Sequence, residues 1–351
     1  MNSNKPVLLV TGVSGRIGKS VALKFANDYQ VVGLDIAESE ALKDKIDFLF
    51  TDISSAENVK DSLAKVREKY GEKIASVIHL AAYYTFSGGQ WEKYEQITIQ
   101  GTQNLLDALA DFTLDQFVFS STMLVYNPAP LGAKLDEDSV VNAKWEYPLS
   151  KVKTENLILE RKSPARSVML RIAGIYDDGC HSIPLSQQIV RIYEKQLESH
   201  FFPGNPQHGA TFLHMDDLVR AIQLIVEKRN TLSHDELFIL GEPEHLSYRE
   251  LQDEMGMLIH GKKWPTLRIP KWMAKVGAYL QGLIPGKKGF IQPWMIDLAD
   301  DHYPVDVAKA KKILGWEPIH VLKNTLPVMV EGFKRDPEAW YREHGFGKLK
   351  Q

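Results

Sequence analysis

A tyrosine and a lysine stand four residues apart in the stretch WEYPLSKVKTEN, from Trp145 to Asn156. In a helix, this spacing puts Tyr147 and Lys151 on one face, one turn from each other. Pro148 suits a helix that begins there, because a proline in the first turn forfeits no intrahelical hydrogen bond. A phenol has a pKa of about 10 and is a weak base at neutral pH, but a nearby ammonium group favours its phenolate. The pair is therefore a candidate for acid–base chemistry, which the rest of the sequence has to support.

Three glycines follow the strand-like run VLLV and stand at the opening of a helical pattern. They are Gly12, Gly15 and Gly18, in the stretch TGVSGRIGKS. Glycines at these positions allow a tight turn and a close approach of backbone to a pyrophosphate, while the helix N-terminus supplies amide donors. The strand before and the helix after are both present, so the sequence predicts a dinucleotide-binding loop that includes Arg16 and Ile17.

The second strand-like run ends in Asp35, seventeen residues beyond Gly18. A carboxylate at this point can accept hydrogen bonds from ribose hydroxyls, and its charge repels the additional phosphate of NADP. Arg16 and Lys19 act in the opposite direction, because a nearby cation can accommodate that phosphate. The sequence predicts NAD as the cofactor, with NADP as the less favoured alternative.

Short β-branched runs alternate with helical patterns through the first half of the chain. Ile17, Val21 and Phe25, for example, have the spacing of one helix face. The regular succession of strand, helix and strand predicts a doubly wound α/β fold whose parallel sheet is covered on both faces. The strand-like runs are VLLV (Val7–Val10), VVGLD (Val31–Asp35), SVIHLAA (Ser76–Ala82), FVFSS (Phe117–Ser121) and SVMLRIAG (Ser167–Gly174).

The regular alternation fades after about Ile172, where loop-rich sequence follows. A helical pattern returns at Asp216 to Glu227, and the strand-like run ELFILG comes after it. We therefore expect a discontinuous arrangement. Residues 1–172 form the nucleotide-binding domain, the chain re-enters that domain at about 212–242, and residues 173–211 and 243–351 form a smaller substrate-binding domain.

Composition narrows the functional classes. The chain has 351 residues, a formal net charge of −3 and a pI near 6.4, with no basic excess that would favour nucleic acid. Cys180 is the only cysteine, which rules out an intramolecular disulfide and favours a reducing compartment. The first strand begins at Val7, which leaves no room for a signal peptide, and no apolar run has membrane-spanning length. The expectation is a cytoplasmic protein without a transmembrane segment.

Several further motifs occur in a fixed order with the glycine loop. They are HLAA (His79–Ala82), SSTMLVY (Ser120–Tyr126), YPLSK (Tyr147–Lys151), LRIAGIY (Leu170–Tyr176), FLHMDDLVRAI (Phe212–Ile222), ELFILG (Glu236–Gly241) and a C-terminal VDVAKAKKILGWEP. With this ordered set the chain resembles the extended short-chain dehydrogenase/reductases, also called the NAD-dependent epimerase/dehydratase family. The likeness extends over nearly the whole chain.

The resemblance implies a Rossmann domain, a smaller C-terminal substrate domain and a catalytic role for three residues. Tyr147 would be the acid/base, Lys151 would support it and hold the nicotinamide ribose, and the Thr122 hydroxyl would align the substrate oxygen. The same resemblance implies further cofactor contacts from Asp52, Ile53, Leu80, Ala81 and Ala82. It also implies a homodimer, through the helices around Trp91 to Ala110 and Tyr147 to Arg161. No resident metal is predicted.

Some positions depart from the family pattern. Met123 and Leu124 stand where sugar-nucleotide dehydratases carry an Asp-Glu pair, which argues against elimination of water. Gly174 and the stretch HGAT, His208 to Thr211, stand where sugar-nucleotide epimerases often have an Asn and an Arg that bind phosphate. Thr98 replaces an Asn with a usual hydrogen-bonding role. A sugar nucleotide is therefore a less favoured substrate.

Candidate substrate contacts are Tyr83, Tyr84, Met123 and His181. Cys180 and His181 stand side by side in a loop after the fifth strand-like run, and a lid loop is favoured there over a thiol nucleophile or metal site. His214, in FLHMDD, is expected to brace the sheet.

A segment near the C-terminus has an apolar stripe at helical spacing. It contains Trp272, Val276, Tyr279, Leu280 and Leu283, with Lys271, Lys275, Lys287 and Lys288 around it. Packing against the substrate domain is favoured, and peripheral contact with a membrane surface is the less favoured interpretation.

Three functional hypotheses follow from these motifs. The leading one is an NAD-dependent oxidoreductase that moves a hydride at a secondary alcohol or ketone carbon. The alternative is an epimerase of a nucleotide sugar, or of a sugar, with tightly bound and recycled NAD; a simple sugar acid is a further candidate substrate. The third hypothesis, a non-catalytic, NAD-responsive binding protein, is the least favoured because the chain keeps both Tyr147 and Lys151.

Overall fold

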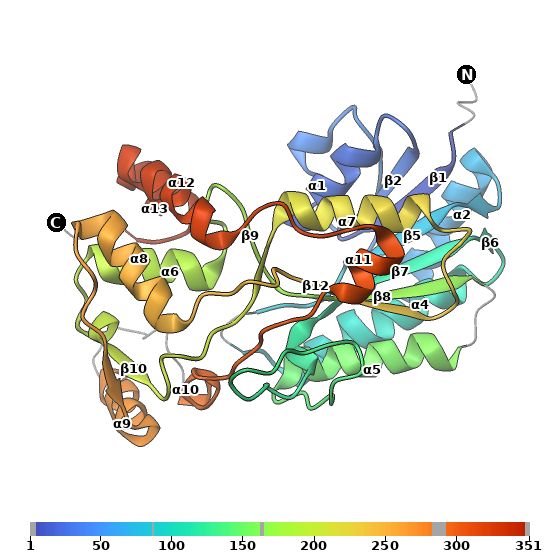
Figure 1. Ribbon diagram of the computed structural model, residues 1–351. Coiled ribbons are helices and arrows are strands. Elements are labelled where there is room, and N and C mark those ends of the chain that lie inside the picture. The colour runs from blue at the N-terminus through green and yellow to red at the C-terminus, as the bar shows by residue number, and fades with distance from the viewer. Residues whose placement is uncertain (1–4, 86–87, 162–164, 283–292, 348–351) are drawn as a thin grey trace.

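Seven parallel strands form the central sheet in the computed structural model, which describes residues 5–85, 88–161, 165–282 and 293–347 (Figure 1). Their spatial order is β12-β8-β7-β5-β1-β2-β3, so the chain runs outward from β1 in one direction and then continues from β5 in the other. The strands are β1 (Val7–Thr11), β2 (Gln30–Asp35), β3 (Asp47–Phe50), β5 (Ser76–His79), β7 (Gln116–Thr122), β8 (Arg166–Ile172) and β12 (Glu236–Leu240). The predicted Rossmann sheet is confirmed, and the reversal between β1 and β5 marks the place where such sheets bind ligands.

Alternate residues of β1 build the two layers that cover the sheet. Leu8 and Val10 belong to a core with α1 (Arg16–Phe25) and α7 (Met215–Glu227), which lie on the upper side in Figure 1. Val7 and Leu9 belong to a second core with α2 (Ala56–Tyr70), α4 (Gly101–Ala108) and α5 (Glu146–Glu160). This alternation follows from the twofold period of a strand and explains why the strand sequences are almost continuously apolar.

Short elements connect these layers. They are β4 (Lys73–Ile74) paired with β6 (Thr113–Leu114), α3 (Trp91–Lys93), a π-helix (Tyr94–Gln100) that continues into α4, and 3-10 turns at Glu40–Leu42, Met123–Val125 and Leu197–His200.

The second half of the molecule packs around a third core (Figure 1). Leu185 and Ile189 of α6 (Ile183–Tyr193), Met255 of α8 (Tyr248–His260) and Phe333 of α12 (Leu322–Arg335) are buried together in it. The other elements are β9 (Gly174–Tyr176) paired with β11 (Phe212–His214), β10 (Phe201–Pro203) paired with β13 (Leu267–Ile269), α9 (Lys271–Gly282), α10 (Pro293–Leu298) and α13 (Pro337–Glu343). The discontinuous arrangement agrees with the predicted fold class, because α7 and β12 return to the sheet.

The chain also returns to the Rossmann half a second time, in α11 (Ala308–Leu314) and the residues after it. Lys309 forms an ion pair of 3.0 Å with Glu236 of β12. Trp316 is fully buried, and its Nε1 donates a 3.0 Å hydrogen bond to the carbonyl oxygen of Asp217 in α7. The Asp217 carboxylate accepts from the backbone amides of Ile319 and His320. The precise domain boundaries stay a prediction, but this late segment packs on the nucleotide-binding half.

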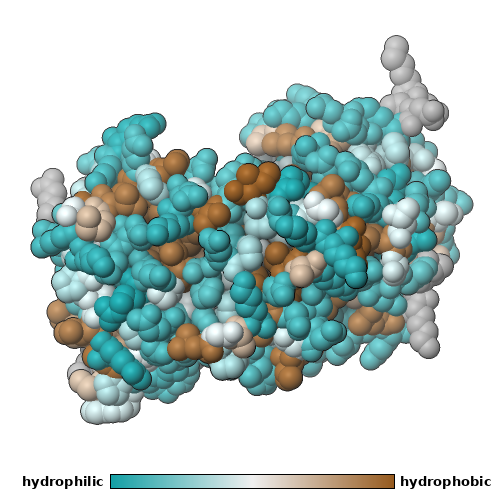
Figure 2. All heavy atoms as spheres, viewed as in Figure 1, coloured by the Kyte–Doolittle hydropathy of each residue, from teal (hydrophilic) through white to brown (hydrophobic). Residues whose placement is uncertain are grey.

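The expected packing of the apolar stripe on α9 is wrong for the residues whose side chains the structure describes. Trp272, Val276 and Tyr279 are 67%, 51% and 66% exposed. The side chain of Leu280 and all of Leu283, Lys287 and Lys288 lie outside the described residues. On the face shown in Figure 2, apolar side chains form separate groups within a mostly hydrophilic surface. In the described part of the chain, no helix combines the length and the apolarity that crossing a membrane requires.

Replacing Trp316 with Ala should lower the free energy of unfolding by about 3–5 kcal/mol, because a fully buried indole and its hydrogen bond are lost. Urea denaturation followed by circular dichroism measures this change. Ile319→Ala, at a position that is 72% exposed, serves as the control and should change stability by less than about 0.5 kcal/mol. Equal effects of the two substitutions would show that the late segment does not stabilise the Rossmann half.

Candidate active site

A cavity of about 630 Å³ lies at the carboxyl ends of the central strands. It joins the glycine loop to the start of α5, so that segments distant in sequence meet where an open parallel sheet binds ligands. The predicted site residues that line it are Gly12, Gly15, Arg16, Ile17, Gly18, Leu80, Ala82, Tyr84, Thr122, Met123, Tyr147, Lys151 and His181. Asp35, Asp52, Ile53, Ala81 and Tyr83 are not among the lining residues.

Close backbone contacts explain two of the three loop glycines. Gly12 has φ of +67°, and a Cβ on it would lie 2.8 Å from the amide nitrogen of Ala81. A Cβ on Gly18 would lie 2.2 Å from the carbonyl oxygen of Gly12. Helix α1 starts at Arg16, directly after Gly15, which has no side chain to cap the first turn. The first amides of α1 are therefore suited to a pyrophosphate, as the sequence predicts.

Asp35 is held at the end of β2, behind the glycine loop. Its carboxylate accepts hydrogen bonds from the backbone amides of Ser14, at 2.9 Å, and Ile36, at 2.7 Å. Because each carboxylate oxygen can accept more than one hydrogen bond, capacity remains for ribose hydroxyls. Asp52 binds the amide and hydroxyl of the nearby Ser54, and Ile53 is buried. The cofactor contacts of Asp35, Asp52, Ile53 and Ala81 stay predictions.

A chain of buried hydrogen bonds under the glycine loop was not predicted from the sequence. The Thr11 hydroxyl accepts from the two amides that follow His79, so its own proton is free to go to Nδ1 of His79, 2.6 Å away. Nε2 of His79 can then donate to Thr102, at 2.8 Å, and Thr102 donates to the carbonyl oxygen of Thr98. Burial lowers the pKa of His79 to about 3, with the positive charge of Lys151 as a smaller cause. The neutral imidazole therefore connects β1, β5 and α4, and it fixes the backbone that Gly12 contacts.

Tyr147 and Lys151 lie on the buried face of α5, whose first residue is Glu146, two residues before Pro148. Thr122 is the last residue of β7 and lies at the same end of the cavity. Burial raises the pKa of Tyr147 above its usual value, Tyr84 and Tyr94 raise it further, and an interaction with the Thr122 hydroxyl lowers it. The ring centroid of Tyr84 lies 4.8 Å from that of Tyr147. The half-buried phenol thus faces the cavity next to a hydroxyl that can align a substrate oxygen.

Lys151 reaches past Tyr147 toward the strand ends. Its Nζ donates a 2.7 Å hydrogen bond to the carbonyl oxygen of Ser120 and lies 5.9 Å from the centroid of the Tyr147 ring. Burial lowers the pKa of Lys151 to about 7, and the negative charge of Glu155 opposes this shift. The Tyr147–Lys151 pair therefore gives up its first proton near neutral pH, although the phenol by itself is a very weak acid in this environment.

A buried ion pair supports this face of α5. Glu155, one turn beyond Lys151, accepts from Nη2 of Arg171 at 2.7 Å and from its Nε at 3.1 Å. The Ser121 hydroxyl also donates to Glu155, and the Arg171 guanidinium lies 4.6 Å from the centroid of the Tyr126 ring. The sequence analysis did not single out Glu155, although Tyr147, Lys151 and Glu155 follow one another at intervals of four. That spacing is the signal that could have found it.

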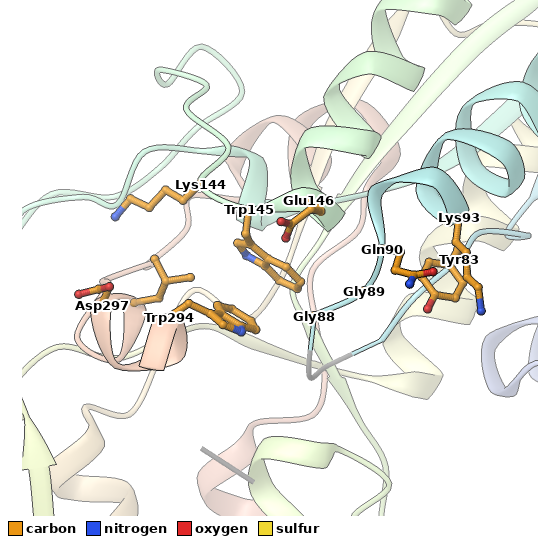
Figure 3. Close-up of a pocket in the computed structure, with 11 residues that line it drawn as sticks. Tyr83, Gly88, Gly89, Gln90, Lys93, Lys144, Trp145, Glu146, Trp294 and Asp297 are labelled. Carbon is orange, nitrogen blue, oxygen red and sulfur yellow. The ribbon is translucent and has the colours of Figure 1, made fainter. Parts of the chain in front are cut away.

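A second cavity, lined by Tyr83, Trp145 and Glu146 among others, lies near the start of α5. Figure 3 shows Trp145 and Trp294 near each other, across from Tyr83, Gln90 and Lys93. The ring centroids of the two tryptophans are 5.1 Å apart, and Trp145 lies 5.6 Å from the Tyr147 ring. Of the two tyrosines considered as substrate contacts, Tyr84 therefore lines the first cavity and Tyr83 lines this neighbouring one.

The loop after β9 contains Cys180 and His181. Cys180 is fully buried, and burial raises the pKa of its thiol, which makes it a poor nucleophile. Nδ1 of His181 lies 2.8 Å from Asp177, and its Nε2 lies 2.9 Å from Glu343. These hydrogen bonds raise the pKa of His181 and hold the loop, so both ring nitrogens are already engaged.

His214 caps helix α7. Its Nδ1 accepts a 3.2 Å hydrogen bond from the backbone amide of Asp216, and its ring stacks on His320 at 3.9 Å. Potential metal-binding atoms of His214, Asp216 and His320 do lie within 4.8 Å of one another. However, Nδ1 of His214 already caps the helix, and Nδ1 of His320 is bonded to Asp217. This arrangement gives His214 the bracing role that the sequence suggests.

The fold and the cleft together define a dinucleotide-dependent enzyme. A model of the NAD-dependent epimerase/dehydratase family matches residues 8–241, and the chain belongs to this family. It is thus an NAD-dependent enzyme of the extended short-chain dehydrogenase/reductase type. The predicted family and the predicted NAD dependence are confirmed.

Similar proteins cover most of the chain. The mouse short-chain dehydrogenase/reductase family 42E member 1 is 27% identical over 377 aligned positions, which cover 97% of this chain and 88% of that protein. Human 3 beta-hydroxysteroid dehydrogenase type 7 is 26% identical and covers 69% of this chain and 72% of its own length. Among solved structures, UDP-glucose 4-epimerase of Thermotoga maritima, determined with UDP-glucose, superposes with a TM-score of 0.71 at 22% identity, covering 95% of this chain and 100% of that one.

Replacing Asp35 with Asn should weaken use of NAD about 10- to 100-fold and improve use of NADP, because a charged acceptor for the ribose is lost together with its repulsion of the 2′-phosphate. Titration of both dinucleotides by calorimetry measures the ratio of their affinities. Glu38→Gln removes an exposed negative charge three residues away and should leave the ratio unchanged. An unaltered ratio in the Asp35 variant would remove Asp35 from the cofactor site.

Proposed function

We propose that this protein oxidises a secondary alcohol, or reduces the corresponding ketone, with Tyr147 as the acid/base. The carrying observation is that Thr122, Tyr147 and Lys151 together line one end of the cavity that begins at the glycine loop, with Thr122 and Lys151 buried and Tyr147 half-buried. When bound, NAD accepts or supplies the hydride at the reacting carbon. The residues that would hold it are the glycine loop, the first amides of α1, Asp35 and Lys151.

The protein's own residues handle the proton. In the oxidation direction, Tyr147 removes the proton of the substrate hydroxyl while the hydride leaves the same carbon, and a ketone forms. The Thr122 hydroxyl donates a hydrogen bond to the substrate oxygen and keeps it within reach of the phenol. Lys151 in its protonated form stabilises the phenolate of Tyr147, and Glu155 opposes the loss of that positive charge. The reverse sequence delivers a proton from Tyr147 to the oxygen of a ketone.

Two features of the cavity favour a substrate that carries no nucleotide. Ala210 and Gly174 line it at positions where phosphate-binding side chains are common in the epimerases that this sequence resembles. Apolar side chains continue from there into an inner cavity of about 410 Å³. We propose therefore that the substrate has a substantial apolar part, which also agrees with the similarity to a hydroxysteroid dehydrogenase.

An epimerase of a nucleotide sugar, or of a sugar, is the second candidate. Its support is the superposition on UDP-glucose 4-epimerase over 95% of the chain. The same Tyr147 and Lys151 would serve in that reaction, because both reactions move a hydride and a proton at one carbon.

We also propose a cytoplasmic homodimer. A single, buried cysteine suits a reducing compartment. Leu149 and Leu159 of α5 are 39% and 37% exposed, as expected for a helix that pairs with the same helix of a second chain. Size-exclusion chromatography with light scattering at micromolar concentration tests this, and a monomer would contradict it.

Tyr147→Phe should reduce turnover at least about 100-fold and leave the affinity for NAD within about threefold, because only the proton-transferring oxygen is lost. Steady-state assays with a panel of secondary alcohols, sugar acids and sterol-like ketones give the turnover, and calorimetry gives the NAD affinity. Tyr193→Phe, at a tyrosine that packs on Phe333 away from both cavities, is the matched control and should retain full activity. Full activity of Tyr147→Phe would refute the assignment.

The rate of alcohol oxidation should depend on the first proton lost by the Tyr147–Lys151 pair. Because burial sets the pKa of Lys151 to about 7, the pair is fully protonated below that pH and cannot accept the substrate proton. We expect kcat/KM for oxidation to rise about tenfold per pH unit up to about pH 7 and then to level off. Lys151→Met should move this rise to much higher pH, because the pKa of Tyr147 alone is raised. A pH profile that is unchanged in Lys151→Met would contradict this mechanism.

The amount of NAD(H) that stays with the purified protein separates the two candidate reactions. Net oxidation or reduction requires exchange of the dinucleotide after each turnover, so denatured protein should release much less than one equivalent. Chromatographic quantification of the released NAD(H) provides the measurement. Release of nearly one equivalent per chain would favour the epimerase instead, since that reaction regenerates NAD in place.

A further inference from the structure

The inner cavity that adjoins the active site has mostly apolar walls. Aromatic and aliphatic side chains come to it from α6, β10, α8 and α10, and they include Phe202, Leu251 and Ile296. Phe202 stacks on Tyr248 with a centroid separation of 3.9 Å. Walls of this kind remove apolar ligand surface from water and do not by themselves select a polar one.

This cavity adjoins the active-site cavity. Leu124, Pro184, Ala210 and Phe212 line both of them. Leu124 comes two residues after Thr122, and Trp145, two residues before Tyr147, also lines the inner cavity. A molecule whose reacting carbon lies at Tyr147 would have to pass between these four side chains to enter the inner cavity.

One guanidinium lines the inner cavity, that of Arg191 near the end of α6. Its Nη2 donates a 2.6 Å hydrogen bond to Oε1 of Gln188, and its buried Nε has no hydrogen-bond partner. Among the residues that the structure describes, no carboxylate lies within 4.0 Å of Arg191, although Glu198 lines the same cavity. Gln188 donates in turn to Tyr248, at 3.3 Å, and to Gln252, which fixes its amide oxygen toward Arg191.

Arg191 is half-buried, and its guanidinium has an unpartnered buried Nε and no ion-pair partner within the part of the chain that the structure describes. Charged groups taken out of water are ordinarily paired, because the desolvation of the charge has to be offset. The planar guanidinium offers parallel donors that match the two oxygens of a carboxylate. Among the described residues, Arg191 is the only lysine or arginine that lines the inner cavity, and Asp301, a carboxylate in the same wall, is paired with Lys144 at 2.9 Å. A single guanidinium suits one negative charge better than the two of a diphosphate.

We propose that the substrate is an apolar secondary alcohol or ketone with one carboxylate remote from the reacting carbon, and that Arg191 binds this carboxylate. The inference rests on the proposed hydride transfer and adds the class of substrate to it. The reacting carbon lies at Tyr147 and Thr122, the apolar body fills the inner cavity, and the carboxylate forms an ion pair with Arg191.

The test measures binding separately from turnover. The NAD-saturated Tyr147→Phe protein is titrated by calorimetry with two hydroxy acids, the rigid lithocholate and the flexible 12-hydroxystearate, and with the methyl ester of each. At least one acid should bind about 10- to 100-fold more tightly than its ester, as expected for a charge-assisted hydrogen bond in a partly buried site. Adding Arg191→Gln should abolish this difference, whereas Arg191→Lys should keep a part of it.

Arg335→Gln, which removes an exposed arginine from α12, is the matched control and should leave the acid-to-ester ratio unchanged. Melting temperatures of the Arg191 variants within a few degrees of the parent exclude loss of the fold. The inference is wrong if the acids bind no better than their esters, if Arg191→Gln has no effect on the ratio, or if neither acid binds. Binding of UDP-glucose in preference to both acids would likewise overturn it and would indicate a nucleotide sugar.

Turnover of the same acids by the unmodified protein tests the underlying function independently. Formation of NADH at 340 nm, lost in Tyr147→Phe, supports the hydride transfer. Arg191-dependent binding of an acid without any NADH formation would support the carboxylate site and contradict the proposed oxidation. Oxidation of neutral alcohols and esters with the same KM as the acids would contradict the carboxylate site, while the proposed hydride transfer would remain supported.

Discussion

The placement of Tyr147 and Lys151 on one helix face, withdrawn from water, is the constraint on which the site depends. A phenol and an amine are both harder to ionise away from water, so desolvation is the main cause that raises the pKa of Tyr147 and lowers that of Lys151 to about 7. The raised pKa keeps the proton on Tyr147, whereas the lowered pKa lets Lys151 lose a proton near neutral pH. The pair can therefore exchange one proton at a pH where both groups would stay protonated in water. The nearby carboxylate of Glu155, which forms an ion pair with Arg171, favours the positive charge of Lys151.

The rest of the fold brings the other groups to this pair. Parallel strands end at one edge of the sheet, so Thr122 at the end of β7 and the glycine loop after β1 meet in one cavity. The neutral His79 and its threonine partners fix the backbone on which Gly12 rests. The second half of the molecule then adds the inner cavity, whose apolar walls adjoin the same site. The glycine loop and the Tyr147–Lys151 pair thus come from the sheet and its helices, and the walls of the inner cavity come mainly from α6, α8 and α10.

Local signals in the sequence predicted most of the Rossmann half. The glycine loop, Asp35 at the end of β2, and the strand-like runs were recognisable because each combines composition with a period of two or of 3.6 residues. The short strand β3 was missed, since four residues without regular alternation carry little signal. The position of the Tyr147–Lys151 pair was also predictable, because a helical spacing fixes which face both residues share.

Interactions between distant segments were not predictable in this way. The ion pair of Glu155 with Arg171, the packing of Trp316 on α7 and the hydrogen bond from Lys151 to Ser120 each depend on tertiary contacts that no local period reveals. The stripe on α9 shows the reverse error, because its helical period predicted packing that the structure does not show for Trp272 and Tyr279. Arg191 carries no motif at all, and only its place in the inner cavity without an ion-pair partner in the described part of the chain singles it out.

The most direct test of this account is the titration of Lys151 itself. Proteins labelled with 13C at the lysine side chains, with Lys151→Met for assignment, allow the Lys151 signal to be followed by NMR between pH 5 and pH 11 in about half-unit steps. The account predicts a midpoint near pH 7, far below the value of about 10.4 for an exposed lysine. A midpoint near the exposed value would contradict the claim that burial sets the proton exchange of the Tyr147–Lys151 pair.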